Sequence, residues 1–232
     1  MLQHAPRLRE DDSRLAPSVA RLLGKGQIHS SGLTWYATGI GFYPVTVSVY
    51  DEAYFNKYRH YGHTELGKKL NAARIAFVGQ HCRNGLLCDI GIGSGSFIAA
   101  RWDVKRQLTL GYDINPASIA WLRDRGLMID PYLAKIPAFS LWDALEHIED
   151  FSPILANCLQ WLFLSLPIFR DREHAERSKH FRRDEHFWYF TANGLISLMD
   201  GYSFDLVAQN DMETQLGRED IGTFAFRRKE RR

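Results

Sequence analysis

The chain has few cysteines, no long apolar run and no excess of charge of either sign, and each shortage excludes a class of protein. Its cysteines, Cys82, Cys88 and Cys158, include no Cys-x-x-Cys pair, so no disulfide framework is predicted and a reducing compartment is expected. The most apolar stretch, 159–169, is far too short to span a bilayer. The charged start at 7–12 lacks the apolar core of a signal peptide. We therefore expect a cytoplasmic protein with no membrane partner.

The charge balance indicates no polyanionic partner. Lys and Arg number 29 against 27 Asp and Glu, a formal net charge of +2, so nothing in the total favours nucleic acid. The stretch 170–185 carries basic and acidic residues in nearly equal number and is expected to pair with itself, and the basic end at 227–232 is expected to be a solubilising tail. The nine histidines form no His-Glu-x-x-His motif and no zinc-spaced Cys/His cluster, so no metal is expected.

The chain is long enough for one substantial core, since 45% of its 232 residues are hydrophobic. Residues 1–62 are predicted to form an N-terminal extension, rich in glycine and aromatic residues from position 32 on. This extension has two interpretations: an accessory aromatic core, or a lid whose tyrosines close over a ligand. Residues 63–232 are predicted to form the main domain.

Strand and helix patterns alternate through the main domain. The predicted strands cover 85–90, 108–113, 139–142, 161–166, 203–209 and 221–226, and the predicted helices cover 64–78, 96–102, 116–125, 152–159 and 191–199. Such alternation predicts a Rossmann-like α/β fold with a mostly parallel sheet and helices on both faces. Ligands of these sheets bind at the carboxyl ends of the strands, which is where the first predicted strand meets a glycine-rich loop.

The loop from Asp89 to Gly95 favours a cationic cofactor. Its glycines form the pattern GxGxG, and Ser96 stands where a dinucleotide-binding fingerprint would need a further glycine. No Lys follows, so the loop is no phosphate-cradling P-loop. The carboxylate of Asp89 would repel a pyrophosphate but suits the ammonium and sulfonium charges of S-adenosylmethionine (SAM). Asp113 ends the next strand, roughly 20 residues further on, where an acid can hold ribose hydroxyls. The alternative is that both acids only cap turns.

These motifs, in this order, resemble the class I SAM-dependent methyltransferases, and most of all the small-molecule branch that contains the ubiquinone-biosynthesis methyltransferases. The resemblance spans about 60–227 and includes the glycine loop, Asp113, the Leu145-Glu146-His147 segment, and the stretch from His180 to Thr191. It implies a seven-stranded sheet whose last strand is antiparallel and lies beside the fifth. It also implies SAM as cofactor, with S-adenosylhomocysteine as product.

The resemblance and the loop chemistry together predict the site residues. The residues expected at the cofactor are Asp89, Ile90, Gly91, Gly93, Ser94, Gly95, Phe97, Asp113, Ile114, Asp130, Trp142, Asp143, Leu145 and His147, with Tyr58 as a lid residue beside Tyr61. Asp130 is the best candidate for the acid near the adenine. The loop between the last two strands is also expected at this edge, with Asn210, Asp211, Glu213, Arg218, Glu219 and Asp220 facing the site unless it is a plain hairpin turn.

Histidines are the candidates for a catalytic base. His147 follows the fourth strand at the carboxyl edge and is the first choice, while His180 and His186 flank a charged loop after the fifth strand. Each has a structural alternative: His147 would hydrogen-bond the adjacent loop, and the other two would cap a helix or support the aromatic residues at 187–190.

The acceptor is expected to be a small molecule, or a nucleotide or sugar-type compound. The [DNS]PP[YFW] motif of DNA amino-methyltransferases is absent after the fourth strand, where the chain reads Trp142-Asp143-Ala144-Leu145, and no cysteine follows a proline as in cytosine-C5 enzymes. Two alternatives stay open. One is a nucleic-acid-modifying enzyme that uses the basic tail with Arg182 and Arg183, and the other is a catalytically silent protein that binds SAM or S-adenosylhomocysteine.

Overall fold

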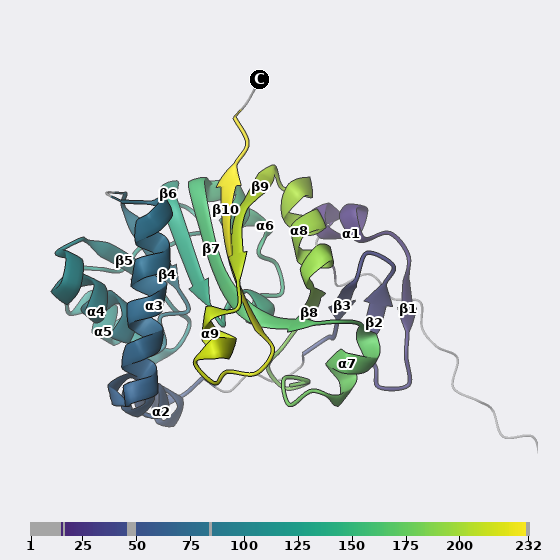
Figure 1. Cartoon of the computed structure of the whole chain (residues 1–232), viewed down its shortest axis with the longest axis horizontal. Helices are drawn as coiled ribbons and strands as arrows, with labels where there is room; N and C mark the ends of the chain where they lie inside the picture. The colour runs from purple at the N-terminus through teal and green to yellow at the C-terminus, as the bar shows by residue number, and fades with distance from the viewer. Residues whose placement is uncertain (1–14, 16, 46–49, 84, 231–232) are drawn as a thin grey trace, which may run out of the picture.

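The computed structural model describes residue 15 and residues 17–45, 50–83 and 85–230. Residues 1–14 of the predicted N-terminal extension and the last two arginines of the basic tail lie outside this part. Ten strands of the described residues form one sheet with helices on both faces (Figure 1). Within the described residues, no helix combines the length and the apolar character needed to cross a membrane.

The centre of the sheet is parallel, as the alternating pattern predicts. Its strands are β4 (Leu87–Ile90), β5 (Thr109–Tyr112), β6 (Ile136–Trp142) and β7 (Cys158–Phe169), in the order β5-β4-β6-β7. The last strand, β10 (Ile221–Arg228), runs antiparallel to β7 on one side and to β9 (Phe204–Asn210) on the other. The prediction of an antiparallel last strand beside the fifth strand is therefore confirmed.

The strand count differs from the seven expected. The third of the seven strands that the resemblance implies is reduced to an isolated bridge. In it, Gly111 N–H donates to the Leu127 carbonyl and Ile129 N–H to the Gly111 carbonyl, each at about 3 Å. The chain then turns at Asp130, and Pro131 has no N–H to extend a ladder. Strands are added at the other edge instead, where β8 (Trp188–Thr191) pairs with the end of β7.

The N-terminal segment lengthens this edge of the sheet. The antiparallel strands β1 (Gly26–Ile28), β2 (Thr34–Tyr36) and β3 (Ile40–Phe42) follow α1 (Pro17–Leu23), and β3 pairs with β8. Tyr36, Ile40 and Phe42 of these strands are buried in the main core. The next helix, α2 (Glu52–His63), lies at the opposite end of the molecule from β1–β3 (Figure 1).

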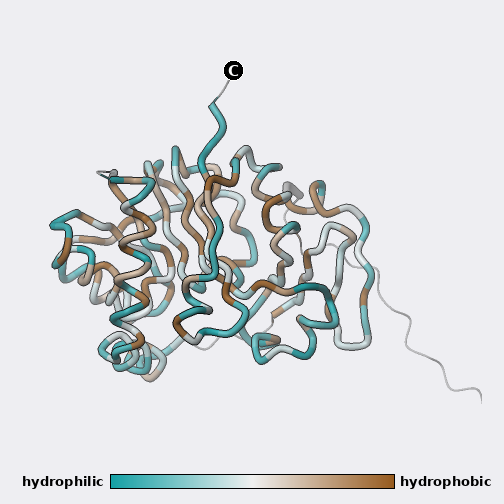
Figure 2. Tube along the Cα trace, in the orientation of Figure 1, coloured by the Kyte–Doolittle hydropathy of each residue, from teal (hydrophilic) through white to brown (hydrophobic). Residues whose placement is uncertain are grey.

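Helices bury both faces of the sheet. α3 (Glu65–His81) and α4 (Ser96–Lys105) contribute Phe77, Val78 and Phe97 to a core on one face. The main core lies on the other face of the sheet, and residues of α6 (Ser152–Asn157), α8 (Ala192–Gly201) and α1 contribute to it. Leu122 of α5 (Pro116–Arg123) packs near the glycine loop. The apolar residues follow the strands and the inward helix faces in Figure 2.

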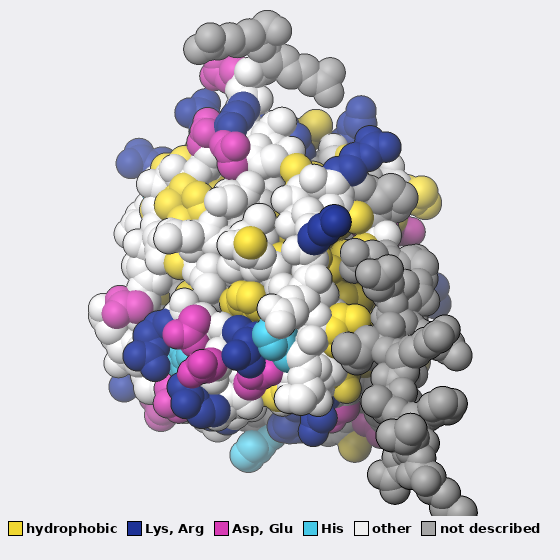
Figure 3. Space-filling view, turned by 90° about the vertical axis from the view of Figure 1, so that its right-hand side faces the viewer, with side chains coloured by type: hydrophobic (Ala, Val, Ile, Leu, Met, Phe, Trp, Pro, Cys, Tyr) yellow, Lys and Arg dark blue, Asp and Glu magenta, His cyan; other side chains and the backbone are white. Residues whose placement is uncertain are grey.

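The segment of mixed charge pairs with itself. Within α7 (Arg172–Arg177), Arg172 forms an ion pair with Glu176. Further along the segment, Arg182 forms an ion pair with Glu185 at 2.5 Å. Figure 3, which views the side of the molecule that carries β1–β3, shows basic and acidic side chains interleaved rather than a patch of one sign.

Candidate functional site

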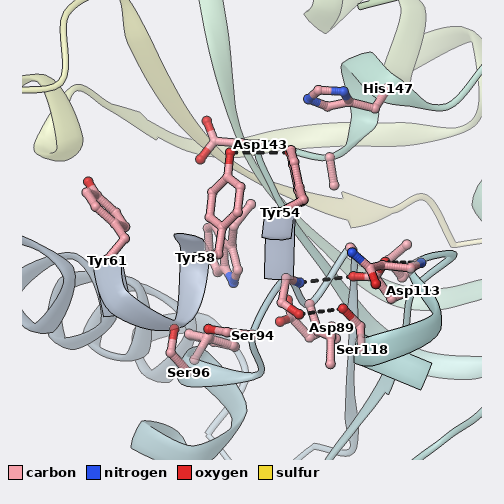
Figure 4. A pocket seen from close by; sticks show the side chains of 18 of the residues that line it. Tyr54, Tyr58, Tyr61, Asp89, Ser94, Ser96, Asp113, Ser118, Asp143 and His147 are labelled. Carbon is pink, nitrogen blue, oxygen red and sulfur yellow. Dashed lines mark hydrogen bonds between the residues drawn. The ribbon is translucent and has the colours of Figure 1, made fainter. Parts of the chain in front are cut away.

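A cavity of about 540 Å³ opens at the carboxyl ends of β4, β5 and β6. One end is formed by the glycine loop that joins β4 to α4. The other end is formed by the 3₁₀ turn η2 (Leu145–His147) after β6 and by the segment 180–186 before β8, with α2 along the side. Figure 4 shows His147 across the cavity from Asp89 and Ser94, with the rings of Tyr54 and Tyr58 between them.

The glycine loop adopts a backbone that other residues disfavour. Gly91, Gly93 and Gly95 have φ values of 74°, 56° and 76°, in the left-handed region that glycine tolerates. A Cβ on Gly91 would stand 2.8 Å from the Ala144 Cβ, and one on Gly95 would meet the Trp121 ring at 2.7 Å. Gly91 and Gly93 line the cavity, whereas Gly95 caps α4 and does not line it. The loop thus turns tightly and leaves its backbone open to a ligand.

Asp89 places a buried carboxyl group at the floor of the cavity. Its side chain is 2% exposed, and its Oδ1 accepts a hydrogen bond from the Ser140 hydroxyl at 2.7 Å. Burial raises the pKa of this carboxyl group to about 7, against the lowering effect of the bond from Ser140. A cationic group placed beside it would relieve this desolvation.

Asp113 links the ends of two neighbouring strands. Its Oδ2 accepts from the Gly93 N–H at 3.0 Å, and its Oδ1 accepts from the Asn115 N–H at 2.8 Å. Burial raises the pKa of Asp113, while these backbone hydrogen bonds lower it. The Ile114 backbone and the Ser118 side chain also hydrogen-bond Asp113, and its carboxylate lines the cavity, where a ligand hydroxyl can donate to it.

Most of the residues predicted at the cofactor line this cavity. Beyond those already described, they are Ile90, Ser94, Phe97, Ile114, Trp142, Asp143, His147 and Tyr58. Asp130 and Leu145 do not line it. The Asp130 Oδ1 accepts from the Tyr132 N–H at 2.8 Å within the turn after α5, and Leu145 is fully buried in the main core.

Tyrosines of α2 and of the residues before it form the cavity wall. Tyr50, Tyr54, Tyr58 and Tyr61 all line it, with the rings of Tyr54 and Tyr58 4.7 Å apart and their hydroxyls at 3.3 Å. The start of α2 is anchored to the end of β5, because Asn115 Nδ2 donates to the Asp51 carbonyl at 2.8 Å. The aromatic wall is therefore tied to the loop that carries Asp113.

A network of two arginines and two carboxylates borders the cavity. Arg218 contacts both oxygens of Asp143, at 2.7 and 2.9 Å, and also binds Glu213 at 2.5 Å. Arg74 of α3 binds both oxygens of Glu213, at 2.6 and 2.8 Å. Burial alone would raise the pKa of Asp143, but Arg218 and Arg74 lower it to about 2.

This network accounts for part of the charged loop between β9 and β10. Arg218 lines the cavity, and Glu213 of α9 (Met212–Gln215) is fully buried behind it. Glu219 instead binds Lys179 at 2.9 Å, and neither it nor Asn210, Asp211 or Asp220 lines the cavity. Sequence reasoning missed Arg74, which carries no motif and is one of many polar residues on its helix.

The three candidate histidines all line the far end of the cavity. The Tyr50 hydroxyl lies 3.0 Å from His147 Nδ1, and the rings of His147 and His186 meet edge to face with centroids 4.5 Å apart. His180 stands apart, with its Nε2 3.0 Å from the Glu219 carbonyl. Burial lowers the pKa of His147 to about 4 and that of His186 well below its usual value.

Glu146 is a site residue that sequence reasoning did not assign, although it stands in the Leu-Glu-His segment. It lines the cavity, is 2% exposed, and burial raises its pKa well above the usual range. Its Oε2 is buried and has no hydrogen-bond partner among the described residues. The segment therefore delivers a carboxyl group and an imidazole to the same end of the cavity.

Comparison with known proteins identifies the fold. No family model matches the chain, and no curated protein matches it. Among solved structures, it resembles the magnesium protoporphyrin IX methyltransferase of Synechocystis with bound S-adenosylhomocysteine, at 13% identity and a TM-score of 0.58 over 76% of this chain and 95% of that one. It also resembles the 1,6-didemethyltoxoflavin N1-methyltransferase of Burkholderia thailandensis, at 12% identity and a TM-score of 0.52 over 89% of this chain and 100% of that one.

The same fold also occurs in a protein with another activity. A [4+2]-cyclase matches at 11% identity and a TM-score of 0.53, over 72% of this chain and 84% of that one. The chain therefore has the Rossmann-like fold of the class I SAM-dependent methyltransferases. At these identities the likeness concerns the fold, so the activity has to be argued from the cavity itself.

Proposed function

We propose that the chain binds SAM at the glycine-loop end of the cavity and transfers its methyl group to a small molecule bound at the far end. The observation that carries this proposal is the pairing of Asp89 and Asp113 across a glycine loop that opens into the same cavity as the tyrosines of α2. One acid suits a cationic group and the other suits hydroxyls, which together match the two halves of SAM.

The cofactor would lie along the loop with its charges matched. Its ammonium and sulfonium groups favour the Asp89 carboxylate, and its ribose hydroxyls would donate to the carboxylate of Asp113. Trp142 lines the same cavity, and its buried indole N–H has no partner among the described residues. The bound S-adenosylhomocysteine in the Synechocystis and Burkholderia structures supports this assignment.

Methyl transfer from SAM needs alignment more than covalent help. A lone pair of the acceptor attacks the methyl carbon, the carbon–sulfur bond breaks, and S-adenosylhomocysteine leaves as a neutral thioether. Holding these atoms in line can contribute several kcal/mol, on the order of 7–11 in favourable cases. A base is needed only for an O–H or a protonated nitrogen, and the histidines line the end where such a proton would be released.

The shape of the site supports a small acceptor. The cavity volume, about 540 Å³, falls within the roughly 300–1,000 Å³ typical of small-molecule sites. Its far end is walled by Tyr50, Tyr54 and His186, which suit a compact aromatic or heterocyclic compound. The self-paired charges of the segment 170–185 offer no basic track beside it.

Calorimetry with SAM and S-adenosylhomocysteine tests the cofactor assignment. We expect sub-millimolar binding to the wild type and at least a tenfold loss in Asp113→Ala. Asp130→Ala is the matched control, because Asp130 is the next predicted cofactor-binding acid along the chain but does not line the cavity. No binding to the wild type, or equal losses in the two variants, would contradict the assignment.

Label transfer tests the reaction. SAM with an isotopically labelled methyl group is incubated with the protein and a small-molecule cell extract, and the label is expected in a low-mass product. Label in RNA or DNA would instead favour the nucleic-acid alternative, with binding that weakens steeply as salt rises. SAM binding without any transfer would leave a silent SAM-binding protein.

A further inference from the structure

The far end of the cavity brings together three metal-ligating side chains. Ligand atoms of Glu146, His147 and His186 all lie within 4.8 Å of one another. Glu146 and His147 stand on the turn η2, and His186 comes from the segment before β8, about 40 residues further along the chain. No spacing rule in the sequence could have joined these residues.

We propose that Glu146, His147 and His186 form a site for a divalent transition-metal ion such as Zn²⁺. Two imidazole nitrogens and one carboxylate oxygen are a donor set that binds such ions with positions left open for another ligand. The same set disfavours Mg²⁺ and Ca²⁺, which prefer oxygen ligands alone. Zn²⁺ bonds of about 2.0–2.2 Å in a tetrahedral site set the ligand atoms about 3.4 Å apart, so separations of up to 4.8 Å would shorten by up to about 1.4 Å.

The surroundings of the three residues support a ligand at this point. The Glu146 Oε2 is buried without a hydrogen-bond partner among the described residues, in a side chain that is 2% exposed. A buried carboxylate oxygen without a partner is costly unless something binds it. The three residues also line the cavity, so an ion bound there would be reachable from the acceptor side.

The backbone holds the ligands in register. The Phe187 N–H donates to the Glu146 carbonyl at 2.8 Å, which fixes η2 against the segment that carries His186. The backbone of Glu185 hydrogen-bonds the His147 ring, a contact of the kind that orients metal-binding histidines. The Tyr50 hydroxyl lies 3.0 Å from His147 Nδ1, so an ion bound through Nδ1 would replace this hydrogen bond.

An ion here would act on the acceptor. This step rests on the proposed function above, with SAM bound at the glycine loop. The open positions of the ion would then face the space left for the acceptor and bind an oxygen or nitrogen atom of the acceptor. The acceptors expected are therefore compounds with a ring hydroxyl, carbonyl or ring nitrogen beside the methylated atom.

Cobalt titration tests the site in the full chain without SAM, so its outcome is independent of cofactor binding. After chelator treatment, we expect one Co²⁺ per chain with visible d–d bands, displaced by Zn²⁺ and unaffected by excess Mg²⁺. Glu146→Gln and His186→Gln should each weaken binding by at least about a hundredfold, since even residues that only orient ligands cost 10–100-fold. His180→Gln, in the same cavity but outside the cluster, should bind as the wild type does.

Several results would overturn the proposal. One is the absence of cobalt bands, and another is an affinity that Glu146→Gln leaves unchanged. A third is binding that is lost in His63→Gln, because His60 and His63 lie three residues apart on α2 and could hold an adventitious ion. If the cluster variants fail to fold, hyperfine-shifted proton signals of the Co²⁺-loaded wild type decide the question: two ligating imidazoles are expected, and none or one would contradict the site.

Discussion

Asp89 is a residue whose environment conflicts with the stability of the fold. Its carboxyl group is buried, and its pKa of about 7 exceeds the usual value of 3.8. Because the folded-state pKa is raised, protonation of Asp89 stabilises the fold. This contribution to the free energy of unfolding is fully present below about pH 4 and is lost as the pH rises through about 7. A shift of this size corresponds to about 4 kcal/mol. Such a cost at the glycine loop is reasonable if a cationic ligand offsets it.

We therefore predict that SAM binding strengthens with pH through the titration of Asp89. Binding a cation requires the ionised carboxylate, so the affinity should fall by up to tenfold per pH unit below about 7. In Asp89→Asn this pH dependence should flatten, while the free energy of unfolding without ligand at pH 8 should exceed that of the wild type. Calorimetry between pH 5.5 and 7.5 and chemical denaturation at pH 8 measure the two effects. An unchanged pH slope in the variant would contradict the role given to Asp89.

Arg218 is the second residue with a testable role. It neutralises Glu213 and Asp143, and Glu213 is fully buried. We predict that Arg218→Met lowers the free energy of unfolding by about 2–3 kcal/mol, because a buried carboxylate loses one of its two partners. Lys68→Met is the control, since its ion pair with Glu65 is exposed and should contribute less than about 1 kcal/mol. If urea denaturation gives the same loss of free energy of unfolding for both variants, the buried network contributes no more to stability than the exposed ion pair does.

At the scale of elements, helix α2 is positioned at both ends, by the close approach of Gly62 to Ser96 and by a hydrogen bond from the Asn115 side chain. A Cβ on Gly62 would stand 2.8 Å from the Ser96 Cβ at the start of α4. That contact, together with the bond from Asn115 to Asp51 at the other end of α2, holds the tyrosine wall over the glycine loop. The helix therefore belongs to the site rather than to the N-terminal strands.

Gly62→Ala should displace α2 and weaken SAM binding. The expected loss is about tenfold, or ~1.4 kcal/mol, measured by calorimetry. Gly79→Ala is the matched helical control, because no atom lies within 4 Å of the added Cβ and alanine favours helix by about 1 kcal/mol. SAM affinity that is the same in both variants would mean that α2 does not shape the cofactor end.

The sequence predicted the elements of the parallel sheet and the glycine loop, because both depend on local patterns. Apolar strands, helix caps such as Thr64 and the glycines at 91, 93 and 95 are visible within short windows. It could not predict contacts set by tertiary packing. Arg74 contacts Asp143 across 69 positions of the chain. The strands β1–β3 join the sheet through β8, which was not among the predicted strands.

At the scale of the whole molecule, one long strand unites the two parts of the sheet. β7 pairs with β6 and β10 along most of its length and with β8 at Ile168 and Phe169. The N-terminal strands continue from β8 and cover a small core of Leu33, Phe169 and Tyr189. A shared strand of this kind couples the extension to the parallel sheet, so the described residues should unfold as one unit.

Leu33→Ala tests this coupling. The side chain is fully buried beside Phe169, so the substitution should lower the free energy of unfolding by about 2–5 kcal/mol. If the molecule is one cooperative unit, hydrogen exchange should show equal losses of protection in the peptides around 34–42 and around 158–169. Leu206→Ala on the edge strand β9, where the side chain is 37% exposed, is the control and should cost less than about 1 kcal/mol. Loss of protection confined to the N-terminal strands would show that they open separately, and the extension would then be a domain of its own.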